Sequence, residues 1–318
     1  MPDDDVDLEL LRASAREFLA ERGEKESVTD LAAMDWTGLL VDEAMGGAGW
    51  RPVETCVVAE ELGRAHDRSA WFGTTMAAAA LAVAPHEVGQ QVLPGLLAGR
   101  ATAGFAVIDD PIRVIRDDID IVIMLDRTGI RLVGDLEPAR FSPDGDLLDV
   151  TRTVWHVDLM DAPSVLIGSP ERAEQLSAVA RLLVAADSVG AVSMTFERLT
   201  AYLRERAAFG APIASFQAIQ HRLVELLVFE VKARAAVLRA ARAIASADER
   251  ATVLTAAAHA FVAAKATGAI DECMQLSGGI GFTWEYPLHY ELRRVFSNGH
   301  LMGTARSSRA LLAEVSGW

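Results

Sequence analysis

The stretch that decides the fold class is PERAEQLSAVARLLVAADSVGAVSMTFERLTAYLRER, from Pro170 to Arg206. Its apolar residues keep a helix-compatible spacing, and Ser169 followed by Pro170 supplies an N-cap and a first-turn proline. The sequence predicts long helices near residues 171–207, 214–247, 250–277 and 286–315. Long helices in succession predict an antiparallel four-helix bundle over residues 171–318.

In the preceding part of the chain the predicted secondary structure changes from helix to strand at about residue 101. Residues 1–100 have helical patterns broken by glycine and proline, with Pro52 at a suitable helix start. The apolar stretch SAWFGTTMAAAALAVA, residues 69–84, is expected to lie buried between helices. Residues 101–170 contain the short β-branched runs FAVID, DIVIML, GIRLVG and TVWHVDL. The predicted fold is therefore mainly α, with an N-terminal helical domain, a reduced β domain and the bundle.

Composition excludes some classes of partner. The net charge of −15, from 45 acidic and 30 basic residues, argues against binding to nucleic acid or to an anionic membrane. The start MPDDDVDLELL lacks the cationic and then apolar pattern of a secretion signal, and the apolar run of residues 76–88 is too short to span a bilayer. Cys56 and Cys273 lie in apolar contexts and are predicted to be buried free thiols. We expect a cytoplasmic protein.

Three segments, taken in order, carry a family resemblance. They are GLLVDEAMGGAGW with VAEELGRA (Gly38–Ala65), RERAAFGAPIASFQAIQHRL (Arg204–Leu223) and QLSGGIGFTWEYPLHYELRR (Gln275–Arg294). Together they resemble the acyl-CoA dehydrogenase family over nearly the whole chain, although the middle of the chain is shorter than the family norm. The resemblance implies the family fold and FAD as cofactor.

The second and third segments contain residue types that suit a phosphate-bearing cofactor. Arg206 offers a planar fork of donors for a pyrophosphate, and Gln217 could bind a ribityl or adenine edge. Glycines after a helix end let main-chain amides approach a phosphate, although they could also simply end the helix and turn the chain. The resemblance implies that the adenosine diphosphate half of FAD, bound across a subunit interface, contacts Arg206, Phe209, Gln217, Gln275, Leu276, Ser277, Gly278 and Gly279.

Other charged residues have less specific interpretations. His289, Arg293 and Arg294 could face a phosphate of CoA or flavin, or could lie on a solvated helix face. Glu60-Glu61 and Arg64 are interpreted as packing and salt-bridge residues rather than catalytic ones.

The family reaction needs a carboxylate base, and both positions where the resemblance places one lack a carboxylate. The Glu-Gly pair that the family has near the start of its last long helix is Met302-Gly303 here, and the position before Arg181 is Ala180. Asp187 is the nearest remaining carboxylate and is a candidate base, although a polar contact between helices is the alternative. The two family segments that enclose the flavin ring are also missing. The position of the first is occupied by FAVIDDPIR (residues 105–113), which lacks the family's residues, and nothing resembles the second.

The chain thus keeps the residues for the adenosine diphosphate half of FAD but lacks the base and the segments that enclose the flavin ring. This contrast predicts a subunit that completes a site shared with another chain. The chain resembles the shorter subunits of actinobacterial α2β2 acyl-CoA dehydrogenases of steroid catabolism. The resemblance implies a 2:2 heterotetramer with a longer homologous subunit, which would carry the base and bind most of the acyl-CoA substrate. The alternatives are a self-sufficient homotetramer with an unrecognised base and a flavin-free scaffold subunit.

Overall fold

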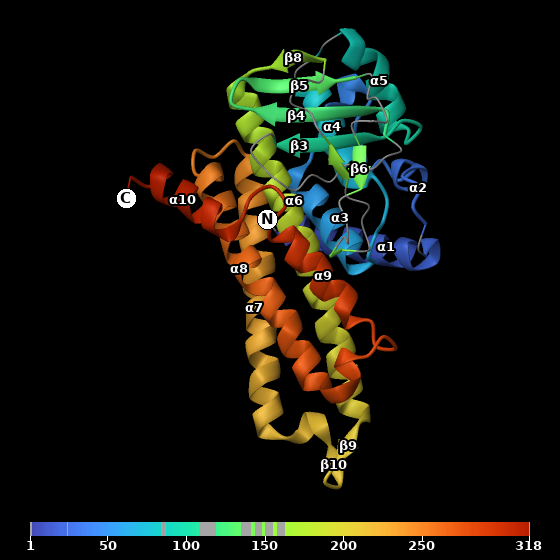
Figure 1. The fold of residues 1–318 in the computed structure, drawn as a ribbon, viewed down its shortest axis with the longest axis vertical. Helices are drawn as coiled ribbons and strands as arrows, with labels where there is room; N and C mark the ends of the chain where they lie inside the picture. The colour runs from blue at the N-terminus through green and yellow to red at the C-terminus, as the bar shows by residue number, and fades with distance from the viewer. Residues whose placement is uncertain are drawn as a thin grey trace.

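The computed structural model describes residues 2–23, 25–83, 85, 87–107, 119–134, 141–143, 148–149, 155–157 and 163–317. A small sheet lies at one end of the molecule, and long helices extend from it to a short hairpin at the other end (Figure 1). This arrangement confirms the predicted fold class, with helical N-terminal and C-terminal parts on either side of a short β region.

The N-terminal part is helical, as predicted. Its elements are α1 (Pro2–Arg22), α2 (Thr29–Ala32), α3 (Pro52–Arg64), α4 (Trp71–Val83) and α5 (Glu87–Leu97), with the 3₁₀ turn η1 (Glu43–Met45) inside the hairpin of β1 (Leu40–Val41) and β2 (Gly49–Trp50). Pro52 opens α3 at the predicted position. Helix α4 is buried along most of its length, because its small apolar side chains let it pack between other elements.

The β region forms a small mixed sheet in the order β3-β4-β5-β8, in which β3 runs parallel to β4 and the other pairs are antiparallel. The strands are β3 (Ala103–Val107), β4 (Ile121–Asp126), β5 (Gly129–Val133) and β8 (Ser164–Gly168), with a separate pair of β6 (Phe141–Pro143) and β7 (Trp155–Val157). The predicted runs supplied β3, β4, β5 and β7, whereas β6 and β8 were not predicted. The part of FAVIDDPIR beyond Val107 lies outside the described residues.

The C-terminal part differs from the prediction in its last helix. Helices α6 (Pro170–Glu205), α7 (Gln217–Ala245) and α8 (Ala251–Ser277) are long, whereas the expected helix over 286–315 is split into α9 (Leu288–Asn298) and α10 (Ala305–Val315). Met302 and Gly303 both have positive φ, and Thr304 caps α10 with a reciprocal capping box. These residues end one helix and start another. The Ser169 N-cap of α6 is confirmed by its side chain, which accepts from the Arg172 amide.

Helix α3 crosses α6 at very short range. A Cβ atom on Gly190 would lie 1.8 Å from the main-chain oxygen of Glu60, and one on Gly63 would lie 2.1 Å from the main-chain oxygen of Asp187. Only glycine allows both backbones to approach this closely. The family segment VAEELGRA therefore has a structural role at Gly63, which holds the N-terminal helices against the bundle.

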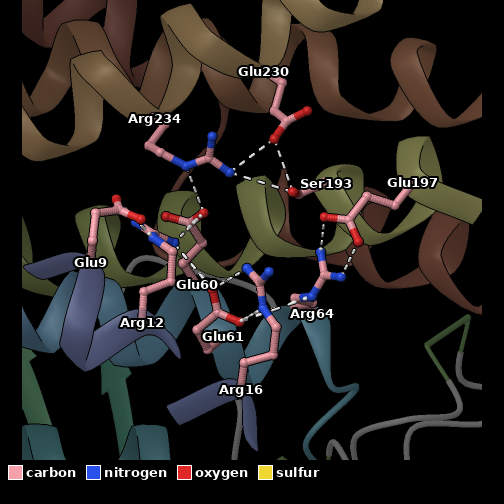
Figure 2. Close-up of polar contacts among 10 residues, drawn as sticks. All are labelled: Glu9, Arg12, Arg16, Glu60, Glu61, Arg64, Ser193, Glu197, Glu230 and Arg234. Carbon is pink, nitrogen blue, oxygen red and sulfur yellow. Dashed lines mark hydrogen bonds and ion pairs between the residues drawn. The ribbon is translucent and has the colours of Figure 1, made fainter. Parts of the chain in front are cut away.

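Charged side chains surround this crossing, as Figure 2 shows. Glu61, almost fully buried, accepts from Arg12 and Arg16 of α1, while Glu60 pairs with Arg12 and with Arg234 of α7. Arg64 pairs with Glu197 of α6. The interpretation of Glu60-Glu61 and Arg64 as packing and salt-bridge residues is confirmed, because they join helices that are far apart in sequence.

Among the described residues, two helical stretches have the length and composition of membrane spans, Pro170–Glu205 and Ala251–Phe282, but their apolar windows are 94% and 50% buried inside the chain. Helix α6 is apolar because it is the core helix of the bundle. Cys56 and Cys273 are buried free thiols, as predicted, and burial raises the pKa of Cys273 to about 12.

Candidate functional site

The predicted cofactor residues lie at the end of the bundle opposite the sheet (Figure 1). Helix α6 ends at Glu205 and α7 begins at Gln217, and between them β9 (Ala207–Ala208) pairs with β10 (Ala211–Pro212), followed by the 3₁₀ turn η3 (Ile213–Ser215). Phe209 and Gly210 take positive φ at the hairpin turn. This conformation projects the Phe209 ring outward, where it is 99% exposed.

Arg206 and Gln217 flank this hairpin with exposed side chains. Among the described residues neither side chain has a hydrogen-bonding partner or an ion pair, unlike the neighbouring Gln220, which donates to the Ala214 oxygen at 3.1 Å. Arg206 and Gln217 are therefore available to bind a ligand or another chain.

The C-terminal end of α8 supplies the other predicted residues. Gln275 is exposed, but Leu276 and Ser277 are buried, and the Ser277 hydroxyl donates to the Cys273 oxygen at 2.8 Å. Of these two residues only the main chain could therefore contact a cofactor. Gly278 has a φ of +68°, and nothing lies within 4 Å of the place where a Cβ on Gly278 or Gly279 would stand. The Gly278 amide is already used, because it donates to the main-chain oxygen of Gln275, but the absence of side chains leaves room for a ligand to approach the main chain here.

The two halves of the site lie at the same end of adjacent helices. Arg222 of α7 pairs with Glu272 of α8. Gln217 precedes Arg222 by five residues and Ser277 follows Glu272 by five, so both lie about 7–8 Å beyond this ion pair along antiparallel helices. The structure thus brings the two predicted segments together.

The donor set fits an adenosine diphosphate group. It combines a guanidinium and two amide side chains that have no partner among the described residues with an uncrowded glycine main chain, and these groups suit a pyrophosphate with a ribityl or adenine edge. All of these groups face outward from a single chain. A ligand held by them would also be open to a second subunit.

The two positions expected to hold a base lie elsewhere, near the start of α6. Ala180 and Met302 have exposed fractions of 0% and 1%. The Arg181 Nε donates to the Met302 oxygen at 3.1 Å, so the two positions are neighbours in space. Neither side chain can accept a proton.

Asp187 is held in a buried ion pair. Its carboxylate oxygens accept from Arg294 Nη2 at 2.6 Å and Nε at 2.9 Å, and Asn298 Nδ2 donates at 2.7 Å. Burial alone would lower the pKa of Arg294, but the charge and hydrogen bonds of Asp187 outweigh burial and raise it above the ordinary value. Arg294 therefore lies neither against a phosphate nor on a solvated face. Asp187 therefore makes the polar contact between helices that was the alternative to a catalytic role, although its partner Arg294 was not predicted.

The interior beside Asp187 is nearly filled. A cavity of about 30 Å³ remains between α3, α4, α6 and α9, and its lining includes Trp71, Phe72, Leu183, Asp187 and Arg294. This volume is far below the several hundred Å³ of pockets that hold ligands the size of a cofactor or drug. The burial of Trp71 agrees with the prediction that the apolar stretch starting at residue 69 packs between helices.

His289 and Arg293 surround an exposed tryptophan after the glycine segment. The His289 ring meets Trp284 edge-on with ring centroids 4.4 Å apart, and the Arg293 guanidinium lies over the same ring at 5.5 Å. Trp284 is 70% exposed. Both residues thus help to position an aromatic surface beside the predicted cofactor residues. We call those residues, at the end of α6, the start of α7 and the end of α8, the cofactor half-site.

Models of the acyl-CoA dehydrogenase N-terminal and C-terminal domains match residues 6–100 and 171–317. The chain belongs to the acyl-CoA dehydrogenase family, and this membership supports FAD as the cofactor predicted from the sequence.

Individual relatives match the chain over nearly its full length. Acyl-CoA dehydrogenase IpdE2 of Mycobacterium tuberculosis is 32% identical over 95% of this chain and 91% of that protein. The Tcur3481-Tcur3483 steroid ACAD G363A variant has a TM-score of 0.84 at 21% identity, with 98% of each chain covered. The ChsE4-ChsE5 complex from Mycobacterium tuberculosis gives 0.82 at 19% identity, covering 98% of this chain and 97% of the other. At these identities the solved structures establish the fold.

Proposed function

We propose that this chain is the non-catalytic subunit of a heteromeric FAD-dependent acyl-CoA dehydrogenase. It contributes the adenosine diphosphate half of a shared FAD site, and a longer homologous subunit holds the flavin ring and the base. The observation that carries the proposal is the contrast within this one chain. The side chains of Arg206, Gln217 and Gln275 are exposed and have no partner among the described residues, whereas the interior beside Asp187 is nearly filled.

Within this proposal each residue at the site has a defined role. Arg206 neutralises the pyrophosphate charge and donates to its oxygens, and Gly278 and Gly279, which lack side chains, let the cofactor approach the main chain beside it. Gln217 and Gln275 bind the ribityl or adenine edge, and Phe209 covers the cofactor against the partner. When bound, FAD accepts the hydride removed from the β carbon of the acyl group. The proton acceptor comes from the partner, because Ala180 and Met302 offer none.

Names of related structures support a heteromeric assembly. ChsE4-ChsE5 is described as a complex of two different chains, and Tcur3481-Tcur3483 is a steroid acyl-CoA dehydrogenase also named for two chains. We infer a 2:2 assembly with two flavins per tetramer. We assign its acyl-CoA thioester substrate to the steroid class on the likeness to the steroid acyl-CoA dehydrogenase.

The test is co-expression with candidate longer subunits, followed by measurement of mass and flavin content. The expected result is a yellow 2:2 complex with two flavins, and loss of turnover with retained flavin when the partner's glutamate base is replaced. A lone chain that binds one FAD per protomer and oxidises an acyl-CoA with an artificial acceptor would support the self-sufficient homotetramer instead. A stable complex without flavin would support the scaffold function.

A further inference from the structure

Helix α7 carries an exposed apolar row on one face. Val224, Leu227, Val228 and Val231 have exposed fractions of 57%, 45%, 43% and 53%. Their spacing of three, four and seven residues places them on the same side of the helix. We call these residues the α7 stripe.

The opposite face of α7 packs against other helices of the same chain. Leu226, Ala233 and Val237 are buried, and α7 packs against α3, α6 and α8. Within the described part of the chain nothing buries the stripe to a comparable degree. Four large aliphatic residues in one row are a stronger signal than scattered exposed side chains, and such rows mark interaction surfaces.

Polar and charged residues border the stripe. Glu225 and Lys232 are exposed beside it, and Arg222 next to its first turn is paired with Glu272. An apolar centre with a charged border is the anatomy of a protein–protein interface. Charges of both signs occur along this border, so it favours a partner surface of mixed charge over a uniformly charged ligand.

The stripe is continuous with the proposed cofactor half-site. It starts seven residues after Gln217, about 10 Å along the helix. The exposed ring of Phe209 lies edge-on to Phe216 just before α7, with ring centroids 6.4 Å apart. A chain that reaches the ligand at Arg206 and Gln217 therefore meets the stripe on the same helix.

We propose that the α7 stripe is the docking surface for the longer subunit that holds the flavin ring, and that an apolar helix face of that subunit covers it. This inference rests on the proposed function, because it takes the shared half-site as the reason for the partner's position. It adds the specific surface that determines assembly, separate from the residues that bind the cofactor.

The test replaces Val228 with Lys in the co-expressed complex. The matched control is Val165→Lys on β8, where the native valine is similarly exposed at 46%, at the edge of the sheet and far from the bundle end (Figure 1). We expect Val228→Lys to weaken association by at least tenfold in light-scattering titrations, while Val165→Lys assembles normally. Both lone chains should unfold at the wild-type temperature. The milder pair Leu227→Ser and Val231→Ser should also weaken association.

Amide hydrogen exchange supplies the second measurement. Residues 221–235 should gain protection when the wild-type chain binds the longer subunit. Normal assembly of Val228→Lys, or no gained protection on α7, would overturn the proposal, as would protection of the stripe by a second copy of this chain alone. If the stripe is protected and Val228→Lys dissociates the complex but no flavin is bound, the docking surface stands and the shared-flavin function fails.

Discussion

The side chain of Arg181 donates a hydrogen bond to the main-chain oxygen of Met302 across 3.1 Å. Arg181 directly follows Ala180, so this contact joins the two positions, 122 residues apart in sequence, where the family resemblance places a base. In this chain both are buried and neither carries a carboxylate. Both positions that could supply a proton acceptor therefore lie in one buried region that contains none at either position.

Replacing Met302 with Glu should not create an active lone chain. The new carboxylate would be buried beside Arg181, next to a cavity of about 30 Å³ that leaves no room for an acyl group. Turnover with an artificial electron acceptor should stay at the background of the Met302→Gln control. Measurable acyl-CoA oxidation by Met302→Glu alone would contradict the interpretation that more than the base is missing.

Replacing Asp187 with Asn should lower stability more than it lowers activity. The substitution removes the hydrogen-bonded carboxylate of a buried pair, a change that costs about 3–5 kcal/mol where no other charge compensates, and the charges of Asp149 and Asp67 near Arg294 should reduce this cost. Activity per assembled complex should fall by less than about tenfold, below the usual effect of removing a general base. Denaturant unfolding and steady-state assays separate the two effects.

The double variant Asp187→Asn with Arg294→Met is the control for this pair. It removes both charges, so it should be more stable than Asp187→Asn alone. A thousandfold loss of activity in a well-folded Asp187→Asn complex would place the base in this subunit.

Sequence patterns predicted local structure better than long-range pairing. The helix starts at Pro52 and Pro170 could be predicted because proline favours the first turn of a helix. The candidate cofactor residues could be named because they lie within two short segments of the sequence. The break between α9 and α10 was missed, because helical periodicity continues on both sides of Gly303. The partner of Asp187 lies 107 residues away and could not be assigned from one sequence.

Replacing Gly190 with Ala should destabilise the fold. The new Cβ would lie 1.8 Å from the Glu60 oxygen, so α3 must move away from α6. Overpacking of this kind costs about 1–3 kcal/mol, and here the obstructing atom belongs to a rigid backbone. Gly268→Ala on α8 is the matched control, since its Cβ meets open space and alanine favours helix. Equal stability of the two variants by thermal unfolding would argue against the close crossing.

His259 should make stability pH-dependent between about pH 6.5 and 4. Burial and the Arg181 charge lower its pKa from 6.5 to about 4, and its Nδ1 lies 2.8 Å from the Ser308 hydroxyl. The unfolded chain therefore binds a proton first as pH falls, and folding stability is lost progressively below pH 6.5, by about 3 kcal/mol at pH 4. His259→Gln should lose less stability over this range in parallel denaturant titrations. Parallel curves for wild type and variant would show that His259 does not titrate in this way.

Replacing Arg206 with Ala should weaken FAD retention while assembly with the longer subunit persists. Arg206 is exposed and unpaired among the described residues, so its loss removes no internal contact and should leave the unfolding temperature unchanged. A charge-assisted hydrogen bond to pyrophosphate is worth about 1.5–3 kcal/mol, which corresponds to roughly a tenfold to hundredfold weaker Kd for FAD. Flavin release from the complex, followed by fluorescence during dilution, gives the measurement. Arg204→Ala is the matched control, because Arg204 is also exposed but precedes the end of α6 and lies outside the predicted cofactor set. Equal FAD affinity in both variants would mean that Arg206 is an ordinary surface residue and that the pyrophosphate is bound elsewhere.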